Sequence, residues 1–251
     1  MAVFISVVSH NHSKIINEIS CLELLAEHFN VVIKSNTPDE DFSFLENISN
    51  INVIRSDFYR GFGENNNLAY KYCKEELDMK GDDYFIVLNP DVSISHLQIF
   101  DLLDSMKSEE CVFSCINLFK NSEMNIYDNS VRKFPTFKQF TFSLLGLGNS
   151  SVIDRSSICH SCEVDWAAGS FLCFQSQHYS MIKGFDEKYF MYCEDVDICY
   201  RSMKKGVRLK YYPDVKAIHY AAHNNRKVFT KHFYWHLKSA LRFLCVKNLS
   251  A

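Results

Sequence analysis

The chain has 251 residues, of which 47% are hydrophobic, so it is long and apolar enough to bury a large core in one main domain. Its 27 basic and 30 acidic residues give a formal net charge of -3, which leaves no overall electrostatic reason to expect nucleic acid as a partner. The ten cysteines include one Cys-x-x-Cys pair without a second pair at zinc-site spacing, so we expect reduced, structural cysteines in a cytosolic setting.

The first half of the chain alternates between predicted strands and predicted helices. Residues 3–8 are apolar and rich in β-branched side chains, without the charged lead of a signal peptide, and they predict a buried strand. Helices are predicted at 15–25 and 61–77, and further strands at 30–33, 51–54 and 84–88. This order predicts a parallel, doubly wound sheet whose ligands lie beyond the carboxyl ends of its strands.

The second half of the chain has a less regular pattern. Strands are predicted at 112–119 and 164–174, a helix at 194–204, and two short strands at 207–211 and 215–219 around a Pro213-Asp214 turn. An aromatic stretch at 134–147 separates the first two of these strands.

The sequence Asn89-Pro90-Asp91 directly follows a predicted buried strand. This position places the Asp91 carboxylate at the carboxyl edge of the sheet, where oxygen ligands can hold a hard cation together with a diphosphate. Asn-Pro-Asp is also a common turn sequence, so an ordinary turn is the alternative interpretation.

An acidic cluster, Glu194-Asp195-Val196-Asp197, begins a predicted helix directly after an aromatic run at 189–192. The helix dipole favours acidic residues at this position, so a solvated helix N-terminus is one interpretation. The large apolar neighbours favour a second interpretation, in which a partly buried carboxylate of shifted pKa acts as a general base.

Two glycines, Gly61 and Gly63, lie between a predicted strand and a predicted helix, where backbone amides can face a phosphate or a nucleotide. The third glycine of the dinucleotide fingerprint is missing, which disfavours a dehydrogenase. The chain also lacks a Walker A sequence, and Ser170 lacks the Gly-x-Ser-x-Gly setting of a nucleophile elbow, which disfavours kinases and hydrolases.

Two further features suggest binding functions. His219 ends a predicted strand and His223 follows it; a neutral imidazole can bind a divalent ion beside a carboxylate, and a structural histidine is the alternative. Residues 226–247 interleave basic and aromatic side chains, as in a helix that lies at an anionic membrane surface or, alternatively, packs on the domain. No stretch approaches the ~20 apolar residues that span a bilayer, so we expect a soluble or peripheral protein.

Five motifs occur together along the chain: His10-Asn11, Gly61-Phe-Gly63-x-Asn65-Asn-Asn67, Leu88-Asn-Pro-Asp-Val92, Asp165-Trp166-x-Ala-Gly169-Ser170 and Gly184-Phe-Asp-x-x-Tyr-Phe-Met-Tyr-x-Glu194-Asp195-x-Asp197. Their order and spacing resemble the family 2 glycosyltransferases over nearly the whole chain. Within that family, His219-Tyr-Ala-x-His223-x-Asn-Arg226 is similar to the rhamnosyltransferases of bacterial O-antigen assembly that act on N-acetylglucosaminyl-diphospho-undecaprenol.

The resemblance implies an α/β domain with a GT-A fold, in which a Rossmann-like, mostly parallel central sheet is flanked by helices. It implies inverting transfer of L-rhamnose from dTDP-β-L-rhamnose to the N-acetylglucosamine of a polyprenyl-diphosphate-linked acceptor, with an α-1,3 linkage, in lipopolysaccharide synthesis. The setting it implies is cytoplasmic, at the inner face of the bacterial inner membrane. We expect the GT-A domain at 1–225, divided near residue 110 into a nucleotide-binding half and an acceptor and catalytic half, with an amphipathic helix at 226–251.

The resemblance also implies roles for single residues. Asp195 would be the base that deprotonates the acceptor hydroxyl, while Asp91 and His219 would hold Mg2+ or Mn2+ on the donor diphosphate. The nucleotide and donor would contact His10, Asn11, Gly61, Gly63, Asn67, Asn89 and Asp91, and the acceptor and donor sugar would lie near Trp166, Gly169, Ser170 and Glu194. An attacking alcohol must lose its proton whereas a leaving diphosphate needs only charge neutralisation, so one carboxylate and one cation suffice.

Two positions depart from the family pattern. Lys34-Ser35-Asn36 stands where many relatives carry an acidic residue that reads the nucleobase, and Asn89 stands where others carry the first aspartate of the metal motif. Two alternatives therefore remain: a transferase with another donor, such as a UDP-hexose or UDP-galactofuranose, and a non-catalytic nucleotide-sugar binding subunit.

Overall fold

The computed structural model describes residues 1–56, 59–136, 139, 151–220 and 231–249. In the amino-terminal half the elements are β1 (Val3–Ser9), α1 (Ser13–Ile19), α2 (Cys21–Ala26), β2 (Asn30–Ser35), the 3-10 helix η1 (Ser43–Leu45), β3 (Ile51–Ile54), α3 (Phe62–Glu75), β4 (Tyr84–Leu88), β5 (Val92–Ser93) and α4 (His96–Ser108). They are followed by β6 (Phe113–Phe119), β7 (Val131–Arg132), β8 (Cys162–Val164), β9 (Trp166–Ala167), β10 (Phe171–Gln175), α6 (Ser176–Met181), α7 (Glu194–Lys204), β11 (Leu209–His219) and α8 (Lys231–Leu249).

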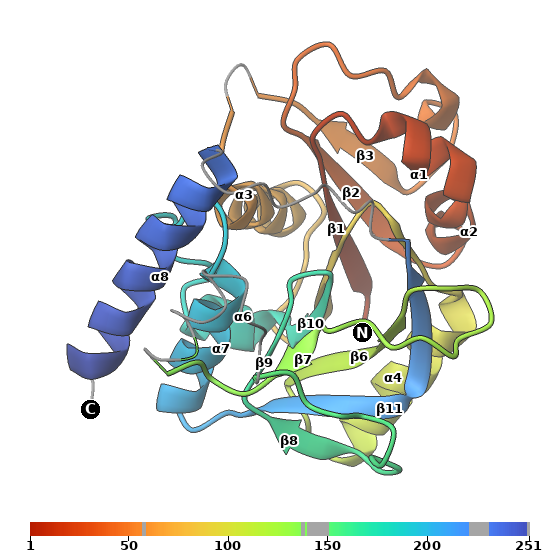
Figure 1. Cartoon of the computed structure of the whole chain (residues 1–251). Coiled ribbons are helices and arrows are strands. Elements are labelled where there is room, and N and C mark those ends of the chain that lie inside the picture. Colours follow the sequence, from red (N-terminus) through yellow and green to blue (C-terminus); the bar gives the residue numbers. More distant parts are fainter. Residues whose placement is uncertain (57–58, 137–138, 140–150, 221–230, 250–251) are drawn as a thin grey trace.

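A twisted central sheet separates two layers of helices (Figure 1). Its strand order is β3-β2-β1-β4-β10-β6-β11-β5, and β8 pairs with β11 beside this path. Strands β1 to β4 are mutually parallel, and β6 and β11 run in the same direction. The prediction of a mostly parallel sheet is therefore confirmed, and β10, β5 and β8 are its antiparallel members.

The two faces of the sheet carry two separate hydrophobic cores. Neighbouring residues of a strand point to opposite faces, so in β4 Phe85 and Val87 join one core while Ile86 and Leu88 join the other. The first core is covered by α3, α6, α7 and α8, and the second by α1, α2 and α4. Because both faces are buried, these strands read as continuous apolar runs, which is why they were predictable from sequence.

Three predicted elements differ from the structure. The helix predicted at 15–25 is two helices, because Ser20 adopts a left-handed conformation with φ of 49° between α1 and α2. The strand predicted at 164–174 is interrupted twice and forms β8, β9 and β10, of which β9 pairs with β7 in a small second sheet.

The third difference concerns the two short strands predicted around Pro213-Asp214, which form the single strand β11. Its register against β6 shifts between Tyr212 and Lys216, and Pro213 lies within this irregularity. A proline has no N–H to donate, so a bulge is one of the few places where a strand accepts it.

Helix α8 runs along the outside of the layer that α3, α6 and α7 form (Figure 1). Its side chains Ala240, Phe243 and Leu244 belong to the first core, so the helix packs on the domain. Among the described residues, no helix combines the length and apolar character needed to cross a bilayer.

Candidate active site

The residues selected from sequence converge at one edge of the sheet. His10 and Asn11 follow β1, the Asn89-Pro90-Asp91 turn follows β4, and His219 ends β11. These strands are parallel, so their carboxyl ends meet at the same edge. Because β10 is antiparallel, Ser170 reaches this edge from the other direction, immediately before its strand begins.

The Gly169-Ser170 pair joins the acidic helix to the turn after β4. The backbone N–H of Asn89 donates to the carbonyl oxygen of Ser170 at 3.0 Å. The backbone N–H of Gly169 faces Asp195 Oδ2 at 3.4 Å. Two adjacent residues therefore connect Asp195 with the turn that carries Asp91, although 104 positions separate the two aspartates in sequence.

His219 lies between two carboxylates. Its Nε2 is 3.3 Å from Asp91 Oδ1, and its Nδ1 is 2.8 Å from Asp128 Oδ2. The backbone reinforces this arrangement, because the N–H of Tyr220 donates to the carbonyl oxygen of Asp91 at 2.9 Å. All three side chains are largely buried.

The charges of this cluster stabilise one another. Burial opposes a proton on His219, but the adjacent Asp128 and Asp91 outweigh it and raise the His219 pKa from 6.5 to about 9. Burial likewise opposes ionisation of Asp91, yet His219 holds the pKa of that carboxyl below its usual value. Asp91 Oδ1 is buried, and apart from its 3.3 Å ion pair with His219 it meets no hydrogen-bond donor among the described residues, so a cation that took the place of the His219 proton would find an oxygen ligand here.

Asp195 is a partly buried carboxylate in the first turn of α7. Burial raises its pKa above 3.8, and the hydrogen bond from the Val196 N–H at 2.9 Å and the charge of Arg132 limit the rise. A carboxylate of raised pKa that stays ionised near neutral pH is a better proton acceptor than an exposed one. The environment of Asp195 therefore suits a general base.

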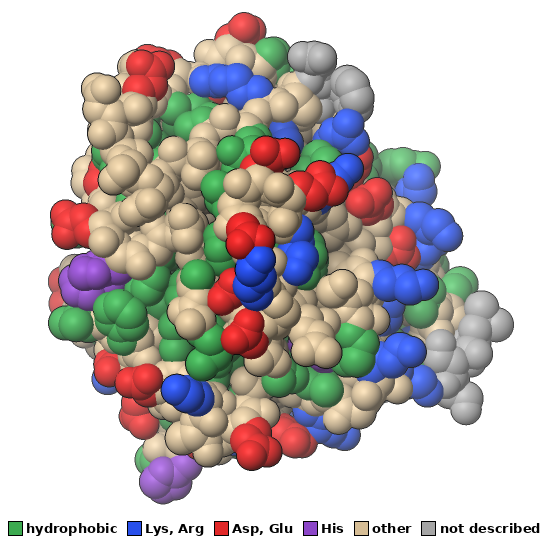
Figure 2. Space-filling view, turned by 180° about the vertical axis from the view of Figure 1, so that it is seen from behind, with side chains coloured by type: hydrophobic (Ala, Val, Ile, Leu, Met, Phe, Trp, Pro, Cys, Tyr) green, Lys and Arg blue, Asp and Glu red, His purple; other side chains and the backbone are tan. Residues whose placement is uncertain are grey.

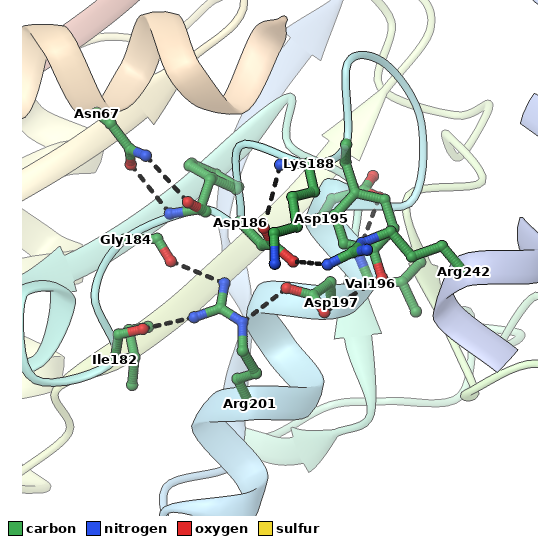
Figure 3. A network of polar contacts seen from close by, with 12 residues as sticks. Asn67, Ile182, Gly184, Asp186, Lys188, Asp195, Val196, Asp197, Arg201 and Arg242 are labelled. Carbon is green, nitrogen blue, oxygen red and sulfur yellow. Dashed lines mark hydrogen bonds and ion pairs between the residues drawn. The ribbon is translucent and has the colours of Figure 1, made fainter. Parts of the chain in front are cut away.

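Glu194 and Asp197 occupy different surroundings from Asp195. Burial and the adjacent Asp195 raise the pKa of Glu194 well above 4.5, so ionisation of this side chain is disfavoured relative to that of an exposed glutamate. Asp197 is 1% exposed, and its Oδ2 accepts from Arg201 Nε at 2.6 Å (Figure 3). The Arg201 guanidinium also donates to the carbonyl oxygens of Ile182 and Gly184, so this ion pair holds the start of the segment 184–192 that leads into α7.

The backbone is strained where this segment enters α7. Tyr192 and Cys193 both have left-handed φ angles, of 68° and 63°. A side chain in this region costs ~1 kcal/mol or more, and such strain persists only where the surroundings impose it. Helix α8 contributes to that restraint, because Ser239 Oγ donates to the Met191 carbonyl oxygen at 2.8 Å and the His236 ring lies against Tyr192.

Gly61 and Gly63, which were predicted to face a phosphate, lie close to the same segment. A Cβ on Gly61 would lie 2.4 Å from the Phe190 carbonyl oxygen, and one on Gly63 would lie 2.7 Å from Phe185 Cβ. The first N–H of α3, that of Phe62, donates to the same Phe190 oxygen at 3.2 Å. Both glycines are needed for the close packing of segment 184–192 on α3, and the expected phosphate contact stays a prediction.

Asn67, which was predicted to contact the nucleotide, makes four side-chain hydrogen bonds within the protein. Its Nδ2 donates to the Phe185 carbonyl oxygen at 2.9 Å and to Glu187 Oε1 at 3.0 Å. Its Oδ1 accepts from Tyr179 Oη at 2.7 Å and from the Phe185 N–H at 3.0 Å. Both amide hydrogens and both lone pairs of the side chain are thereby used inside the protein, and Figure 3 shows the two bonds to the Phe185 backbone, so Asn67 anchors segment 184–192.

Three other residues predicted for the site, His10, Asn11 and Trp166, differ in how far they are exposed to solvent. His10 and Asn11 are exposed, and the His10 ring lies 5.3 Å from the ring of Tyr59. Trp166 is buried, its indole N–H donates to the Lys133 carbonyl oxygen at 2.9 Å, and Arg132 covers its ring.

Sequence reasoning missed two residues of this region, Asp128 and Arg201. Asp128 lies in a loop without a motif, and Arg201 looks like an ordinary basic residue in the last turn of a helix. A helical spacing of four residues from Asp197 was the one available signal for Arg201. His223 and Arg226 lie outside the described residues.

Comparison with known proteins identifies relatives over the whole chain. The rhamnosyltransferase WbbL of Escherichia coli is 39% identical over 253 residues, which cover 98% of this chain and 94% of that protein. The N-acetylglucosaminyl-diphospho-decaprenol L-rhamnosyltransferase of Mycobacterium tuberculosis is 30% identical over 181 residues, covering 66% of this chain and 56% of the relative. No protein-family model matches the chain.

Solved structures of glycosyltransferases share the fold. GalNAc-T7, crystallised with UDP, GalNAc and Mn2+, superposes with a TM-score of 0.63 at 11% identity, over 96% of this chain and 47% of that protein, so the chain spans about half its length. Staphylococcus aureus TarS in complex with UDP-GlcNAc gives a TM-score of 0.59 at 15% identity, over 100% of this chain and 67% of that one. The fold is GT-A, and the chain belongs to the rhamnosyltransferases of glycosyltransferase family 2, the group that includes Escherichia coli WbbL.

Proposed function

We propose that this glycosyltransferase moves L-rhamnose from dTDP-β-L-rhamnose, with inversion, to the N-acetylglucosamine of a polyprenyl-diphosphate-linked acceptor in O-antigen synthesis. The observation that carries the proposal is the similarity to a rhamnosyltransferase over 98% of the chain. The acceptor class is supported by the Mycobacterium tuberculosis relative, whose name specifies an N-acetylglucosaminyl-diphospho-decaprenol substrate. The α-1,3 linkage is part of the same proposal.

Asp195 is the proposed base. It lies in the first turn of α7, with one carboxylate oxygen held by the Val196 N–H at 2.9 Å and the other 3.4 Å from the Gly169 N–H. In this role the carboxylate accepts the proton of the acceptor hydroxyl while that oxygen attacks the anomeric carbon. Attack opposite to the leaving dTDP inverts the configuration at that carbon.

Asp91 and His219 are the proposed ligands of a divalent cation, Mg2+ or Mn2+. Two adjacent ligands at ~2.1 Å from an octahedral ion lie ~3 Å apart, and Asp91 Oδ1 and His219 Nε2 are separated by 3.3 Å. Among the described residues, no three His, Cys, Asp or Glu side chains are grouped as a complete metal site. This fits an ion whose coordination is completed by substrate phosphate oxygens, and such an ion neutralises charge on the leaving diphosphate.

Residues after β1 and after β4 are proposed contacts for the nucleotide. His10 and Asn11 lie at the carboxyl edge of the sheet, and Asn89 begins the turn that carries Asp91. Asn36, which stands where many relatives have an acidic residue, exchanges two hydrogen bonds with the backbone of Arg60, at 3.0 and 2.9 Å. The Asn36 amide thereby holds the loop at Arg60, so we expect other residues to discriminate between dTDP and UDP.

We also propose that α8 contacts the cytoplasmic membrane surface, where a lipid-linked acceptor resides. Its outward face carries Tyr234, which is 64% exposed, and Leu241, which is 50% exposed, together with the exposed Lys238. Figure 2 shows Lys and Arg side chains along the edge of the molecule on which α8 lies. Apolar side chains flanked by basic ones are the pattern of a helix that binds an anionic interface.

The chain is proposed to consist of two parts. We propose a GT-A unit at 1–225 and a helical appendage at 226–251; their junction falls within 221–230, outside the described residues. The packing of Phe243 and Leu244 into the first core supports an appendage that stays docked on the GT-A unit.

A donor panel tests the proposed function. Purified protein with Mg2+ or Mn2+ is given a lipid-linked N-acetylglucosamine diphosphate acceptor and, in separate reactions, dTDP-rhamnose, a UDP-hexose and UDP-galactofuranose. We expect transfer from dTDP-rhamnose; transfer only from a UDP-sugar refutes the proposed donor. If a donor raises the melting temperature by binding but no donor is consumed with any acceptor, the chain is a non-catalytic binding subunit.

A vesicle assay tests the proposed membrane contact separately. The chain should co-sediment with vesicles that contain phosphatidylglycerol, and the double variant Tyr234→Ser with Leu241→Ser should co-sediment less. Equal sedimentation of both proteins contradicts a role for this face of α8.

A further inference from the structure

We propose that Asp128 is a positioning residue, which fixes the His219 ring so that Nε2 faces Asp91 and the donor-diphosphate cation. This inference rests on the proposed function, because it concerns the cation site that Asp91 and His219 form there. Asp128 lies in the loop that connects β6 with β7, at a position that belongs to none of the sequence motifs.

The fold brings Asp128 to His219 through a loop that returns along the end of β6. The Lys120 N–H donates to the Ile126 carbonyl oxygen at 2.8 Å, and the Asp128 N–H donates to the Leu118 carbonyl oxygen at 2.9 Å. These bonds close the loop into a short hairpin on the last residues of β6. Asp128 is therefore held by backbone hydrogen bonds to a central strand of the sheet.

The neighbouring strand presents His219 to that hairpin. β11 is parallel to β6, with Ile218 opposite Phe119, so His219 lies just beyond the last residue of β6. The hairpin is further anchored by its aromatic side chain Tyr127, whose ring lies 5.0 Å from the Phe119 ring and under the Arg155 guanidinium. Asp128, on the hairpin bonded to β6, and His219, at the end of β11, are therefore brought into contact because these two strands are paired.

The contact with Asp128 determines the chemical form of the His219 ring. An ionised carboxylate can only accept a hydrogen bond, so the 2.8 Å contact requires the proton of the imidazole on Nδ1. With no cation bound, Nε2 also carries a proton and pairs with Asp91 Oδ1 at 3.3 Å; a bound cation would take the place of that proton, and the neutral ring that keeps its proton on Nδ1 would then present the Nε2 lone pair. Histidines that bind metals commonly donate their other N–H to a carboxylate in this manner, which orients the ring and increases its basicity.

Asp128 is a positioning group and not a third ligand. It contacts Nδ1, whereas Asp91 is next to Nε2, so the imidazole ring separates the two carboxylates. The buried Asp91 Oδ1, whose one close polar neighbour among the described residues is His219 Nε2, marks the side on which a cation would be bound. Asp128 therefore acts on the cation only through His219.

The experiment measures Mn2+ affinity in the full chain, by electron paramagnetic resonance of free Mn2+ in the presence of dTDP. We expect Asp128→Ala to weaken Mn2+ binding roughly 10- to 100-fold, the usual effect of removing such a partner. Asp128→Asn should lose less, because its carbonyl oxygen can still accept from Nδ1. Glu123→Gln is the matched control, since it removes one negative charge from the same loop at an exposed position, and it should bind Mn2+ like the wild type.

The steady-state kinetics give a second readout. If Asp128 only positions His219, excess Mn2+ restores kcat of Asp128→Ala to within a few-fold, and the change appears in the Mn2+ concentration for half-maximal rate. An unchanged Mn2+ affinity in Asp128→Ala, with His219→Ala clearly weakened, overturns the inference while leaving the cation site intact. Unchanged affinity in both variants refutes the cation site itself, and wild-type Mn2+ binding without rhamnose transfer refutes only the proposed donor.

Discussion

Gly61 and the Phe190 carbonyl oxygen lie so close that a Cβ on the glycine would be 2.4 Å from that oxygen. This approach fixes segment 184–192 on α3, together with the hydrogen bonds of Asn67 to Phe185 and Glu187. The segment continues directly into α7, whose first turn carries Asp195. The position of the proposed base therefore depends on contacts made by a helix that belongs to the nucleotide-binding half.

The first prediction concerns this contact. Gly61→Ala should displace the Phe190 backbone and lower kcat roughly 100-fold, because misplacing a catalytic group by ~1 Å has an effect of that order. Steady-state kinetics and a thermal melt measure the two consequences. Gly81→Ala is the control, since its Cβ would meet Gln177 Cβ at an ordinary 3.6 Å. Equal loss of activity in both variants contradicts the explanation.

The second prediction concerns pH. A base must be ionised, and burial raises the Asp195 pKa above 3.8, so kcat/KM should fall as the pH decreases through an apparent pKa above that value. The charge of Arg132 lowers the Asp195 pKa. Arg132→Gln should therefore move this acidic limb to higher pH. A limb that stays in place in the variant shows that another group controls the titration.

The third prediction concerns stability. Asp197 is 1% exposed and paired with Arg201 at 2.6 Å, and Arg201→Met leaves that carboxylate without its cation. Removing one partner of a buried pair costs about 3–5 kcal/mol of unfolding free energy. Urea denaturation measures this loss. In contrast, Lys14→Met breaks an exposed pair with Glu18 and should cost under ~1 kcal/mol. Similar losses in the two variants would falsify the structural role of Arg201.

The fourth prediction concerns Lys34, which is 2% exposed although it is a lysine. Its Nζ donates to the Ser35 carbonyl oxygen and to Ser56 Oγ, yet burial, with the charge of Arg60 in second place, lowers its pKa from 10.5 to about 8. The unfolded chain therefore binds more protons than the folded one between pH 8 and 10.5, and this site makes the protein more stable as the pH rises through that window.

Lys34→Met removes the group that titrates, and it provides the test. The unfolding free energy of the wild type minus that of Lys34→Met should increase from pH 7 to pH 10. Urea titrations at several pH values measure this difference, and because both proteins share the other titrating groups, those contributions cancel. A difference that is constant with pH contradicts a lowered pKa at Lys34.

Sequence patterns predicted the bounds of the helices and strands better than they predicted which strands pair with one another. The apolar runs of β1 and β4 and the helix α7 were found close to their true bounds, because burial on both faces and an acidic first turn leave clear local signals. Nothing local shows that β10 is inserted antiparallel between β4 and β6, since that depends on pairing with strands far away in sequence.

The candidate site shows the same division between local and long-range information. Asp91, Asp195 and His219 lie at strand ends or a helix start, and these positions are visible in the sequence. Asp128 reaches His219 from 91 positions away through a hairpin that only the folded chain defines. Gly61, Gly63 and Asn67 were recognised as a motif, but their packing on segment 184–192 was not, because a glycine that faces a phosphate and a glycine that faces a backbone look alike in sequence.

The most direct test of the central claim is the rate of rhamnose transfer by Asp195→Asn, measured with saturating dTDP-rhamnose, Mn2+ and lipid-linked acceptor. Loss of a general base typically lowers kcat by ~100- to 10,000-fold, and we expect a loss in that range while the Mn2+ affinity and the melting temperature stay close to those of the wild type. A variant that transfers rhamnose at the wild-type rate would show that Asp195 is not the base and that this carboxylate serves the fold alone.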